Sequence, residues 1–598
     1  MKLTAGELSM YYEDGFLRWI TAGKNEILRM VYFAVRDKEW NTVAGKIINE
    51  KIERTKKNFI VSYEMLFEKD DIKMQWNAVI EGDSDNRIVF DIKGKALSTL
   101  KKNRIGFCIL HPIEECQGKN VLIQHRNGNL EENIFPVNIS PQQPFKNIEA
   151  MQWRLNNDLK VTVNFEGDIF ETEDHRNWTD NNYKTYSTPL EIPFPVTINE
   201  GDEIHQKIII KVDGSITKKE NKNSVEIVVE ENKLPIPTIG VGRASVRDEN
   251  YHEALKVLST VGFSHYRVDL KLSDHDWQQT LEDCFKEAAL LNTKLEIALF
   301  INFSTIKRIL EFINVIKGRK DIQQIMVLEE GQKYITNSLL NEALTGLRLQ
   351  LPGILIGAGT DMYFAELNRS KLDASGIDFV SYSINPQVHA FDDSSIMENA
   401  SVQGATVLSA KQKFNKPVHI SPVTLRMRYN AEATEVSTNL PPLDKRQSEN
   451  INAAWTLASL KSLIENGASS ITYFETIGTR GLGIYDSLKG SNIFPVAWVL
   501  NALLAGRPYV LKSRCTNPFA IISLVLAYDN KIEILIGNKT KKIQKIHLAI
   551  TGKFKAADLI TGHAIDIAGT DQGAISIKLK AYQIIVLTQF VLQPSNKI

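Results

Sequence analysis

Carboxylates and a histidine at the ends of apolar segments are the first candidates for chemistry. Glu475 closes the run ITYFE, Glu296 interrupts the run KLEIALFI, and His389 lies in NPQVHAFDD beside two aspartates. A buried carboxylate needs a partner, and a neighbouring carboxylate raises the basicity of a histidine. This combination predicts general acid–base catalysis, with Glu475, Glu296 and His389 as candidate catalytic residues.

Each of these three residues also has a structural interpretation. Glu296 would be equally well explained as a buried partner of Arg267. His389 would be equally well explained as an ordinary histidine of a surface loop. Glu475 is less expected by chance at the end of an apolar run, which favours a functional role. The HxxxD spacing lacks a further histidine at helical spacing, so the sequence predicts no metal and no cofactor.

Further polar residues are candidates for binding a polar substrate. Those that belong to or follow the apolar runs are Arg267, Asp269, Asn385, Asp392, Arg428 and Asn430. The segment FETEDHRNWTDNNYKTY (170–186) crowds charges among aromatic residues, which is costly unless the groups pair or meet a polar ligand. The segment adds Glu173, Arg176, Trp178 and Lys184 as candidate substrate-binding residues. The alternative is that it forms a solvent-exposed hairpin with no binding role.

The elements that must position these residues alternate between apolar runs and amphipathic segments. Eight candidate strands are 237–242, 265–270, 294–301, 322–329, 353–359, 378–384, 417–423 and 469–475. Between them, segments such as 277–291 and 451–467 carry apolar residues at the three- and four-residue spacing of helices. Eight such units predict a (β/α)₈ barrel, in which the C-terminal strand ends converge. A doubly wound sheet is the alternative, but it usually has fewer strands and a glycine-rich phosphate turn.

The flanking regions show a β pattern. Short alternating runs up to about residue 213 predict an antiparallel β-sandwich, and a Lys- and Glu-rich stretch at 213–233 predicts its end and a linker. The β pattern returns after residue 505. The predicted fold is therefore α/β with three domains: an N-terminal β-sandwich (1–233), a barrel (234–508) and a small C-terminal β-sandwich (509–598).

Composition excludes several classes of protein. The chain has 598 residues, and its 71 Lys and Arg balance 71 Asp and Glu, which argues against a nucleic-acid or membrane partner. The four cysteines form no CxxC pair. The start lacks the apolar stretch of a signal peptide, and no apolar run is long enough to span a bilayer, so we expect a cytoplasmic protein. No serine-hydrolase elbow, Walker motif or complete dinucleotide fingerprint is present, and nothing indicates an oligomeric state.

Longer motifs resemble those of the D-apionate lactonase (D-apionolactonase) family. Besides 170–186 they are GTDMYFAELNR (359–369), NPQVHAFDDSSIMEN (385–399), RMRYN (426–430), DKRQ (444–447), LHP (110–112) and ISPQQPF (139–145). The resemblance runs from about residue 10 to beyond 500, in order, and its motifs are long and specific. It implies a barrel with β-domains, as in glycoside hydrolases, and hydrolysis of D-apionolactone to D-apionate in D-apiose catabolism.

Lactone opening needs a base or nucleophile, donors for the oxyanion and a proton for the leaving alkoxide. Glu475 is the expected base or nucleophile, with Glu296 or His389 as the proton donor. The groups expected to hold the oxygen atoms of the substrate are Arg267, Arg428 and Asn385, with Trp178 and Lys184 reaching in from the first domain. Two other functions stay open: a glycoside hydrolase with paired carboxylates in one cleft, and a non-catalytic barrel that binds carbohydrate.

Overall fold

The computed structural model describes residues 1–156, 159–216, 224–429, 443–486, 490–548, 553–569 and 575–590. These residues form two compact units. The first unit holds the chain up to residue 216, except for Asn177–Asp180. Those four residues belong, with the described chain from residue 224 onward, to the second unit.

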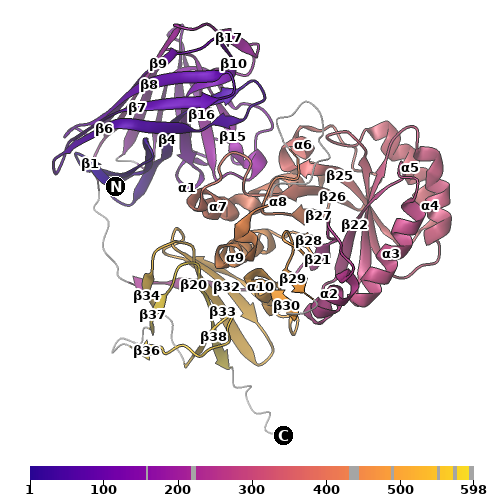
Figure 1. Cartoon of the computed structure of the whole chain (residues 1–598). Coiled ribbons are helices and arrows are strands. Elements are labelled where there is room, and N and C mark those ends of the chain that lie inside the picture. Colours follow the sequence, from indigo (N-terminus) through magenta and orange to yellow (C-terminus); the bar gives the residue numbers. More distant parts are fainter. Residues whose placement is uncertain are drawn as a thin grey trace. The chain divides into compact units, whose positions relative to one another are not determined.

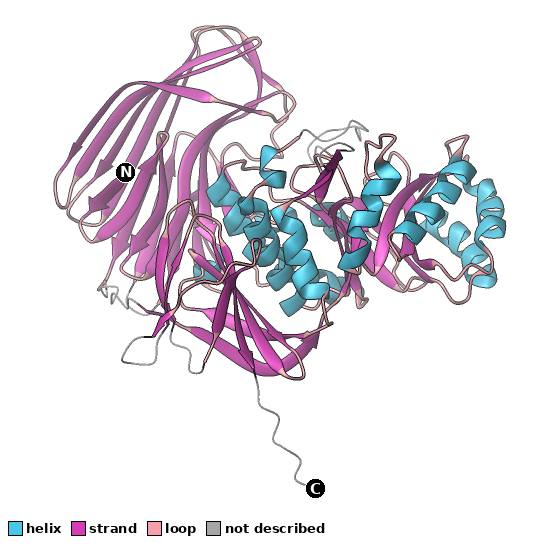
Figure 2. Ribbon diagram, turned by 60° about the horizontal axis from the view of Figure 1, so that its bottom comes forward, coloured by secondary structure: helices cyan, strands magenta, loops and turns pink. Residues whose placement is uncertain are grey.

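The first unit consists almost entirely of antiparallel strands (Figure 2). Its strands are β1 (Lys2–Ala5), β2 (Leu8–Glu13), β3 (Phe16–Ala22), β4 (Asn25–Asp37), β5 (Thr42–Val43), β6 (Gly45–Arg54), β7 (Phe59–Lys69), β8 (Ile72–Gly82), β9 (Arg87–Ala96), β10 (Leu100–Pro112), β11 (Asn120–His125), β12 (Leu130–Ile134), β13 (Phe145–Arg154), β14 (Lys160–Glu166), β15 (Phe170–Asp174), β16 (Asn182–Tyr186), β17 (Val196–Ile198) and β18 (Glu203–Asp213). The short helix α1 (Ile113–Cys116) accompanies them, and the turn η1 (His175–Trp178) begins in this unit and ends in the second. This confirms the predicted antiparallel β architecture before the barrel.

An aromatic cluster shows how this sheet buries its apolar face. The Phe33 ring of β4 lies 5.4–6.3 Å from the rings of Phe67, Trp76, Phe90 and Phe107, measured between centroids. Strand β4 pairs with β10, whereas β7, β8 and β9 pair among themselves. Side chains from strands that do not pair with one another therefore share one core. Alternate residues of β7 are buried, as expected for a strand with one face toward this core.

The second unit contains the predicted barrel (Figure 1). Its parallel strands close in the order β21 (Thr238–Gly242), β22 (His265–Lys271), β23 (Lys294–Ile301), β24 (Ile322–Glu329), β25 (Leu355–Tyr363), β26 (Phe379–Ile384), β27 (Val418–Val423) and β28 (Ser470–Glu475), and β28 pairs with β21. Seven strands agree with the predicted limits to within one residue. Strand β25 runs four residues further than predicted, which places Asp361 inside it.

Each barrel strand is separated from the next by at least one helix, and α10 follows the last strand. They are α2 (Tyr251–Leu258), α3 (Trp277–Leu290), α4 (Ile309–Ile316), α5 (Asn337–Gln350), α6 (Phe364–Arg369), α7 (Asp393–Asn399), α8 (Gln403–Phe414), α9 (Asn450–Glu465) and α10 (Pro495–Leu504). Helix α3 buries Trp277, Leu281, Cys284 and Phe285, which recur at three- and four-residue spacing. Within the described ranges, no helix has both the length and the apolar character needed to cross a membrane.

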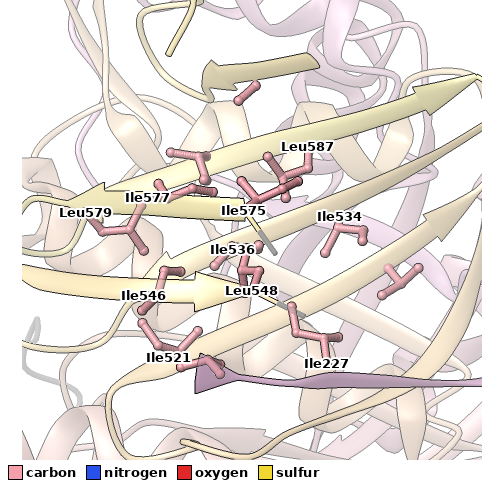
Figure 3. Packing of buried hydrophobic residues seen from close by; sticks show 14 of the residues in the cluster. Ile227, Ile521, Ile534, Ile536, Ile546, Leu548, Ile575, Ile577, Leu579 and Leu587 are labelled. Atoms are coloured by element: carbon pink, nitrogen blue, oxygen red, sulfur yellow. The ribbon is translucent and has the colours of Figure 1, made fainter. Parts of the chain in front are cut away.

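Two further sheets belong to the second unit. One contains β19 (Ser224–Val225), β34 (Gln544–Leu548), β36 (Ala568–Gly569) and β37 (Ile575–Leu579); the other contains β20 (Ile227–Pro235), β31 (Tyr509–Cys515), β32 (Ile521–Ala527), β33 (Lys531–Asn538), β35 (Lys555–Asp558) and β38 (Ile584–Phe590). A short hairpin, β29 (Gly483–Asp486) and β30 (Gly490–Ile493), precedes α10. Ile546 and Ile577 of the first sheet share one apolar cluster with Ile534 and Leu587 of the second (Figure 3).

Strand β20 lies before the barrel in sequence and pairs with β31 after it. Ile227 is opposite Cys515, and Pro235 is opposite Tyr509. The sequence assigned residues up to 233 to the first domain, whereas this pairing joins 227–235 to the C-terminal strands. The reason for the difference is that β20 is mostly exposed, so its composition resembles that of a linker. The exact domain limits and the C-terminal sandwich stay predictions.

Candidate active site

A cavity of about 500 Å³ lies at the C-terminal ends of the barrel strands. Its walls come mainly from the ends of β21, β22, β27 and β28 and from the loops that follow them, with Phe300 of β23 and Thr280 of α3. Glu475, Arg267, Asp269 and Arg428, all singled out in the sequence, line this cavity together. Because the side chains at these strand ends converge on one axis, a barrel places its reactive groups here.

Glu475 presents one carboxylate oxygen to this cavity without a protein partner. Its Oε2 atom accepts hydrogen bonds from the backbone N–H of Ser245 at 2.9 Å and from the Ser245 hydroxyl at 3.0 Å. Its Oε1 atom has no hydrogen-bond donor among the residues that the structure describes. The side chain is half-buried. The carboxylate is therefore oriented by Ser245 on one side and available for chemistry on the other.

The backbone beside Glu475 is irregular, and this irregularity aims the side chain. Phe474 has φ 54°, a left-handed conformation that is rare for a bulky residue. The pairing of β21 with β28 shifts at the same point, so that Gly242 lies opposite Glu475. A bulge of this kind redirects the side chain that follows it and is common next to active sites.

Gly242 makes this bulge possible. A Cβ atom at this position would lie 2.8 Å from the Phe474 carbonyl oxygen. We expect Gly242→Ala to displace Glu475 and to lower turnover about tenfold or more, because misplacing a reacting group by 1 Å can cost about a hundredfold. Steady-state kinetics with D-apionolactone, the substrate that the family resemblance implies, measure this change. Gly353→Ala is the matched control, since a Cβ there meets nothing within 4 Å; equal activity of the two variants would contradict the prediction.

A second polar cluster at the cavity consists of two arginines, two aspartates and a tyrosine. Asp361 accepts hydrogen bonds from Arg267 at 2.5 Å, from Arg428 at 2.7 Å and from the Tyr429 hydroxyl at 2.5 Å. Asp269 accepts from Arg267 at 2.9 Å and from Arg428 at 3.0 Å. Both guanidinium groups are thus fixed side by side, with part of Arg428 on the cavity wall.

Asp361 stays charged in spite of its burial. Removal from water by itself raises the pKa of the Asp361 carboxyl, but the positive charges of Arg428 and Arg267 and the hydrogen bonds from Arg428 and Tyr429 hold that pKa below its ordinary value. The same partnership raises the pKa of Arg428. The pair of arginines therefore carries its full positive charge at any pH near neutrality.

The other carboxylates on the cavity wall are engaged or exposed. Asp444 receives hydrogen bonds from Arg446 and Gln387, and these bonds outweigh burial and lower its pKa to about 2. Asp274 and Asp276 also line the cavity but are exposed. Asp269 is occupied by both arginines. Among the described residues, Glu475 is therefore the half-buried wall carboxylate that keeps an unoccupied oxygen.

A lysine supplies a positive charge without a carboxylate partner. Lys271, at the end of β22, lines the cavity and is half-buried. The described part of the chain offers its ammonium group no ion pair. Arg267 and Arg428, in contrast, already form ion pairs with Asp361 and Asp269. Lys271 is thus free to neutralise a charge that develops on a bound molecule.

Glu296 does not line the cavity. It is buried inside the barrel, where it accepts hydrogen bonds from Gln324, from the Ser421 hydroxyl and from Thr472 at 3.2 Å. Arg267 also donates to Ser421, at 3.1 Å. The structural interpretation of Glu296 as a partner inside the barrel therefore matches its surroundings, with Ser421 between it and Arg267.

His389, Asn385 and Asp392 also lie outside the residues that line the cavity. His389 Nδ1 is 2.5 Å from Asp180 Oδ2, so its carboxylate partner is not one of the two aspartates that follow it in sequence. Asn385 is buried and accepts, through its side-chain oxygen, the backbone N–H of Gln387. Asp392 caps α7 by accepting the backbone N–H of Ser395.

The candidates from 170–186 divide between the two units. In the first unit, Lys184 donates to Glu173 at 3.2 Å, and Arg176 makes a two-pronged bond to Asp174 at 2.7 and 2.8 Å. Trp178 belongs to the second unit, where it is buried against Tyr363 and Ala365. Asn430, the remaining candidate, lies outside the described residues.

Several residues of the cavity escaped sequence analysis. Ser245 and Lys271 carry no motif, and Gly242 is distinguished only by its place at the end of the first barrel strand. Asp361 and Tyr429 do lie in the motifs GTDMYFAELNR and RMRYN, which were noticed for their resemblance and not for their chemistry. Reading β25 to its true end would have identified Asp361 as a strand-end acid.

Comparison with known proteins gives a consistent match over most of the chain. Residues 1–215 match the family model "D-apionate lactonase, N-terminal domain", and residues 239–507 match "D-apionate lactonase, TIM barrel domain". The chain is 28% identical over 583 residues to D-apionate lactonase of Brucella anthropi, with 92% of this chain and 94% of that protein covered.

Solved structures with similar coordinates include two arabinofuranosidases. The α-L-arabinofuranosidase of Thermotoga maritima has a TM-score of 0.46 and 11% identity, covering 62% of this chain and all of that chain. A family 51 α-L-arabinofuranosidase of Bifidobacterium longum has a TM-score of 0.43 and 11% identity, covering 61% of this chain and 99% of that chain.

Proposed function

Because this chain belongs to the D-apionate lactonase family, we propose that it is a lactone hydrolase that opens D-apionolactone to D-apionate in D-apiose catabolism, with Glu475 as its base. The observation that carries the proposal is the unoccupied Oε1 atom of Glu475 on the wall of a 500 Å³ cavity. A cavity of this volume suits a small molecule. Its polar lining suits a substrate rich in hydroxyl groups.

The proposed reaction needs only groups that line the cavity. Glu475 takes a proton from a water molecule, and the resulting hydroxide attacks the lactone carbonyl carbon. The negative charge that moves to the carbonyl oxygen is stabilised by Lys271 and Arg428. When the ring C–O bond breaks, Glu475 returns the proton to the leaving alkoxide. The product is a hydroxy acid, which loses its proton to give the carboxylate.

This assignment differs from the sequence-based one in its proton donor. Glu296 and His389 do not line the cavity, so Glu475 serves both steps. Asn385 is likewise left out of the proposal. Asp269, Arg267 and Arg428 keep their proposed role as groups that bind substrate hydroxyl and carbonyl oxygens, since all three line the cavity.

The alternatives have less support. A glycoside hydrolase requires a second carboxylate able to act as acid or nucleophile. Within the described residues of the cavity wall, Asp269 and Asp444 are both tied to arginines, and Asp274 and Asp276 are exposed. At the end of β24, Glu329 accepts the backbone N–H of Thr336 and does not line the cavity. A non-catalytic barrel would have its buried wall carboxylates in separate ion pairs, whereas the half-buried Glu475 has no ion pair in the described chain.

A substrate panel tests the proposed function. We expect the purified full-length chain to hydrolyse D-apionolactone faster than other aldonolactones, followed by proton release and by NMR of the ring-opened acid. Aryl glycosides in the same buffer serve as the glycosidase arm. Cleavage of an aryl glycoside without lactone opening would replace the proposal with the glycosidase alternative. Because lactones also open spontaneously, the same buffer without enzyme supplies the background rate.

A further inference from the structure

Asn177–Asp180 lie in the first third of the sequence but form part of the same compact unit as the barrel. Asn368 donates to the Asn177 side chain at 2.9 Å, and Thr179 donates to the Asn385 carbonyl at 3.1 Å. Thr179 has φ 65°, a rare conformation for a β-branched residue. A strained backbone of this kind persists only where its surroundings hold it, so these contacts fix the segment on the barrel.

Further contacts of the segment surround the indole ring of Trp178. The Trp178 indole is buried, with the Arg369 guanidinium 4.9 Å from its centroid and the His389 ring edge-on at 5.2 Å. Asp180 accepts from Asn399 at 2.8 Å and lies 2.5 Å from His389. The ring also packs in one apolar cluster with Tyr363, against which Met427 packs.

Tyr363 connects this cluster to the cavity. Its hydroxyl donates to the Tyr429 carbonyl at 2.6 Å and accepts the Tyr429 backbone N–H at 3.3 Å. Tyr429 and its neighbour Arg428 line the cavity and both bond to Asp361. Met427, next to Arg428, touches the cluster directly. Trp178 therefore supports, through Tyr363 and Met427, the backbone that presents Arg428 and Tyr429.

We infer that Asn177–Asp180 is a positioning element of the site: Trp178 keeps Tyr363 and Met427 in place, and they keep Arg428 and Tyr429 ordered on the cavity wall. Trp178 does not line the cavity, so it acts through other residues and does not bind substrate directly. The activity consequences of this inference rest on the proposed function. Its structural consequence, an ordered 424–429 loop, does not.

Two substitutions interrupt the connection at different points. We expect Trp178→Ala and Tyr363→Phe each to raise the KM for the lactone about tenfold, because substrate binding must then order two cavity side chains. The kcat should stay within about threefold, since the bound state is restored once the loop is ordered. The double variant should be no worse than the more severe single variant, because both remove the same support. Trp178→Phe keeps a ring in the cluster and should recover wild-type KM.

Hydrogen exchange measured by mass spectrometry supplies a readout that needs no activity. The peptide spanning 424–429 should exchange faster in Trp178→Ala and in Tyr363→Phe than in the wild type. Tyr382→Phe is the matched control: it removes another buried tyrosine hydroxyl of the barrel, one bonded to Thr406 at 2.6 Å, and should change neither KM nor this exchange.

The outcomes separate the two claims. The inference would be overturned if Tyr363→Phe changed neither hydrogen exchange nor KM. It would also be overturned if Trp178→Ala lowered only the unfolding temperature, because the segment would then contribute to stability and not to the order of the cavity wall. Additive effects in the double variant would also overturn it. If the wild-type chain opens no lactone, the proposed function fails, and the exchange data alone still decide whether Trp178 orders the loop.

Discussion

Replacing Glu475 with glutamine is expected to lower the kcat for lactone opening by about 10²–10⁴, the usual contribution of a general base. Glutamine keeps the shape of the side chain and can still accept the Ser245 hydrogen bonds through its oxygen. It cannot take a proton from water. The loss should therefore fall on kcat, with KM changed little, in initial-rate measurements corrected for spontaneous hydrolysis.

Glu329→Gln is the matched control for this substitution. Glu329 is also a half-buried acid at the C-terminal end of a barrel strand, but it is outside the cavity and its partner is the Thr336 backbone. Its activity should remain near that of the wild type. A Glu475→Gln enzyme with near wild-type turnover would remove Glu475 from the mechanism, and among the described wall carboxylates only the exposed Asp274 and Asp276 would then be without an arginine partner.

Asp361→Asn should produce the largest loss of stability among the cavity residues. The substitution leaves Arg267 and Arg428 close together with only the exposed Asp269 to balance them. Removing one member of a buried ion pair costs about 3–5 kcal/mol, because the charge left behind is not solvated. We expect an earlier thermal unfolding transition, followed by fluorescence, and a loss of substrate affinity as Arg428 moves.

The same carboxylate predicts a pH dependence. Since the pKa of Asp361 is lower in the folded protein than in the unfolded chain, its contribution to stability is present above about pH 4 and disappears as the pH falls through the lowered pKa. Asp361→Asn should therefore flatten the acid side of the stability profile. Glu253→Gln removes an exposed helix ion pair and should cost less than about 0.5 kcal/mol. Equal losses in the two variants would show that Asp361 contributes no more than a surface acid.

Most of the barrel could be predicted because its physical signals are local. Strands buried on both faces read as continuous apolar runs, and the helices between them keep a buried stripe. The exception, β25, continues through Thr360 and Asp361, where polar residues end the apolar signal although the backbone stays extended. The missed acid and the missed end of the strand therefore have the same cause.

The sequence could indicate residues of the candidate site only where they stand at or just after the end of a predicted barrel strand. Glu475 and Arg428 were found because they stand at or just after strand ends, which converge in a barrel. The partner of His389 could not be found, since Asp180 lies 209 positions away and the two nearby aspartates suggested a local pair. Glu296 was ambiguous for a related reason, because a polar residue within an apolar strand can be catalytic or can form hydrogen bonds inside the barrel. The three-dimensional structure shows that Ser421 and Gln324 donate hydrogen bonds to it.

The pairing of β20 with β31 has a consequence for synthesis on the ribosome. Ile227 emerges long before its partner Cys515. At elongation rates of about 5–20 residues per second, the earlier strand waits roughly 15–60 s with its hydrogen-bonding edge open. The whole barrel sequence is translated during that interval. The nascent chain can thus assemble the barrel first and pair β20 with β31 only after Cys515 has been translated.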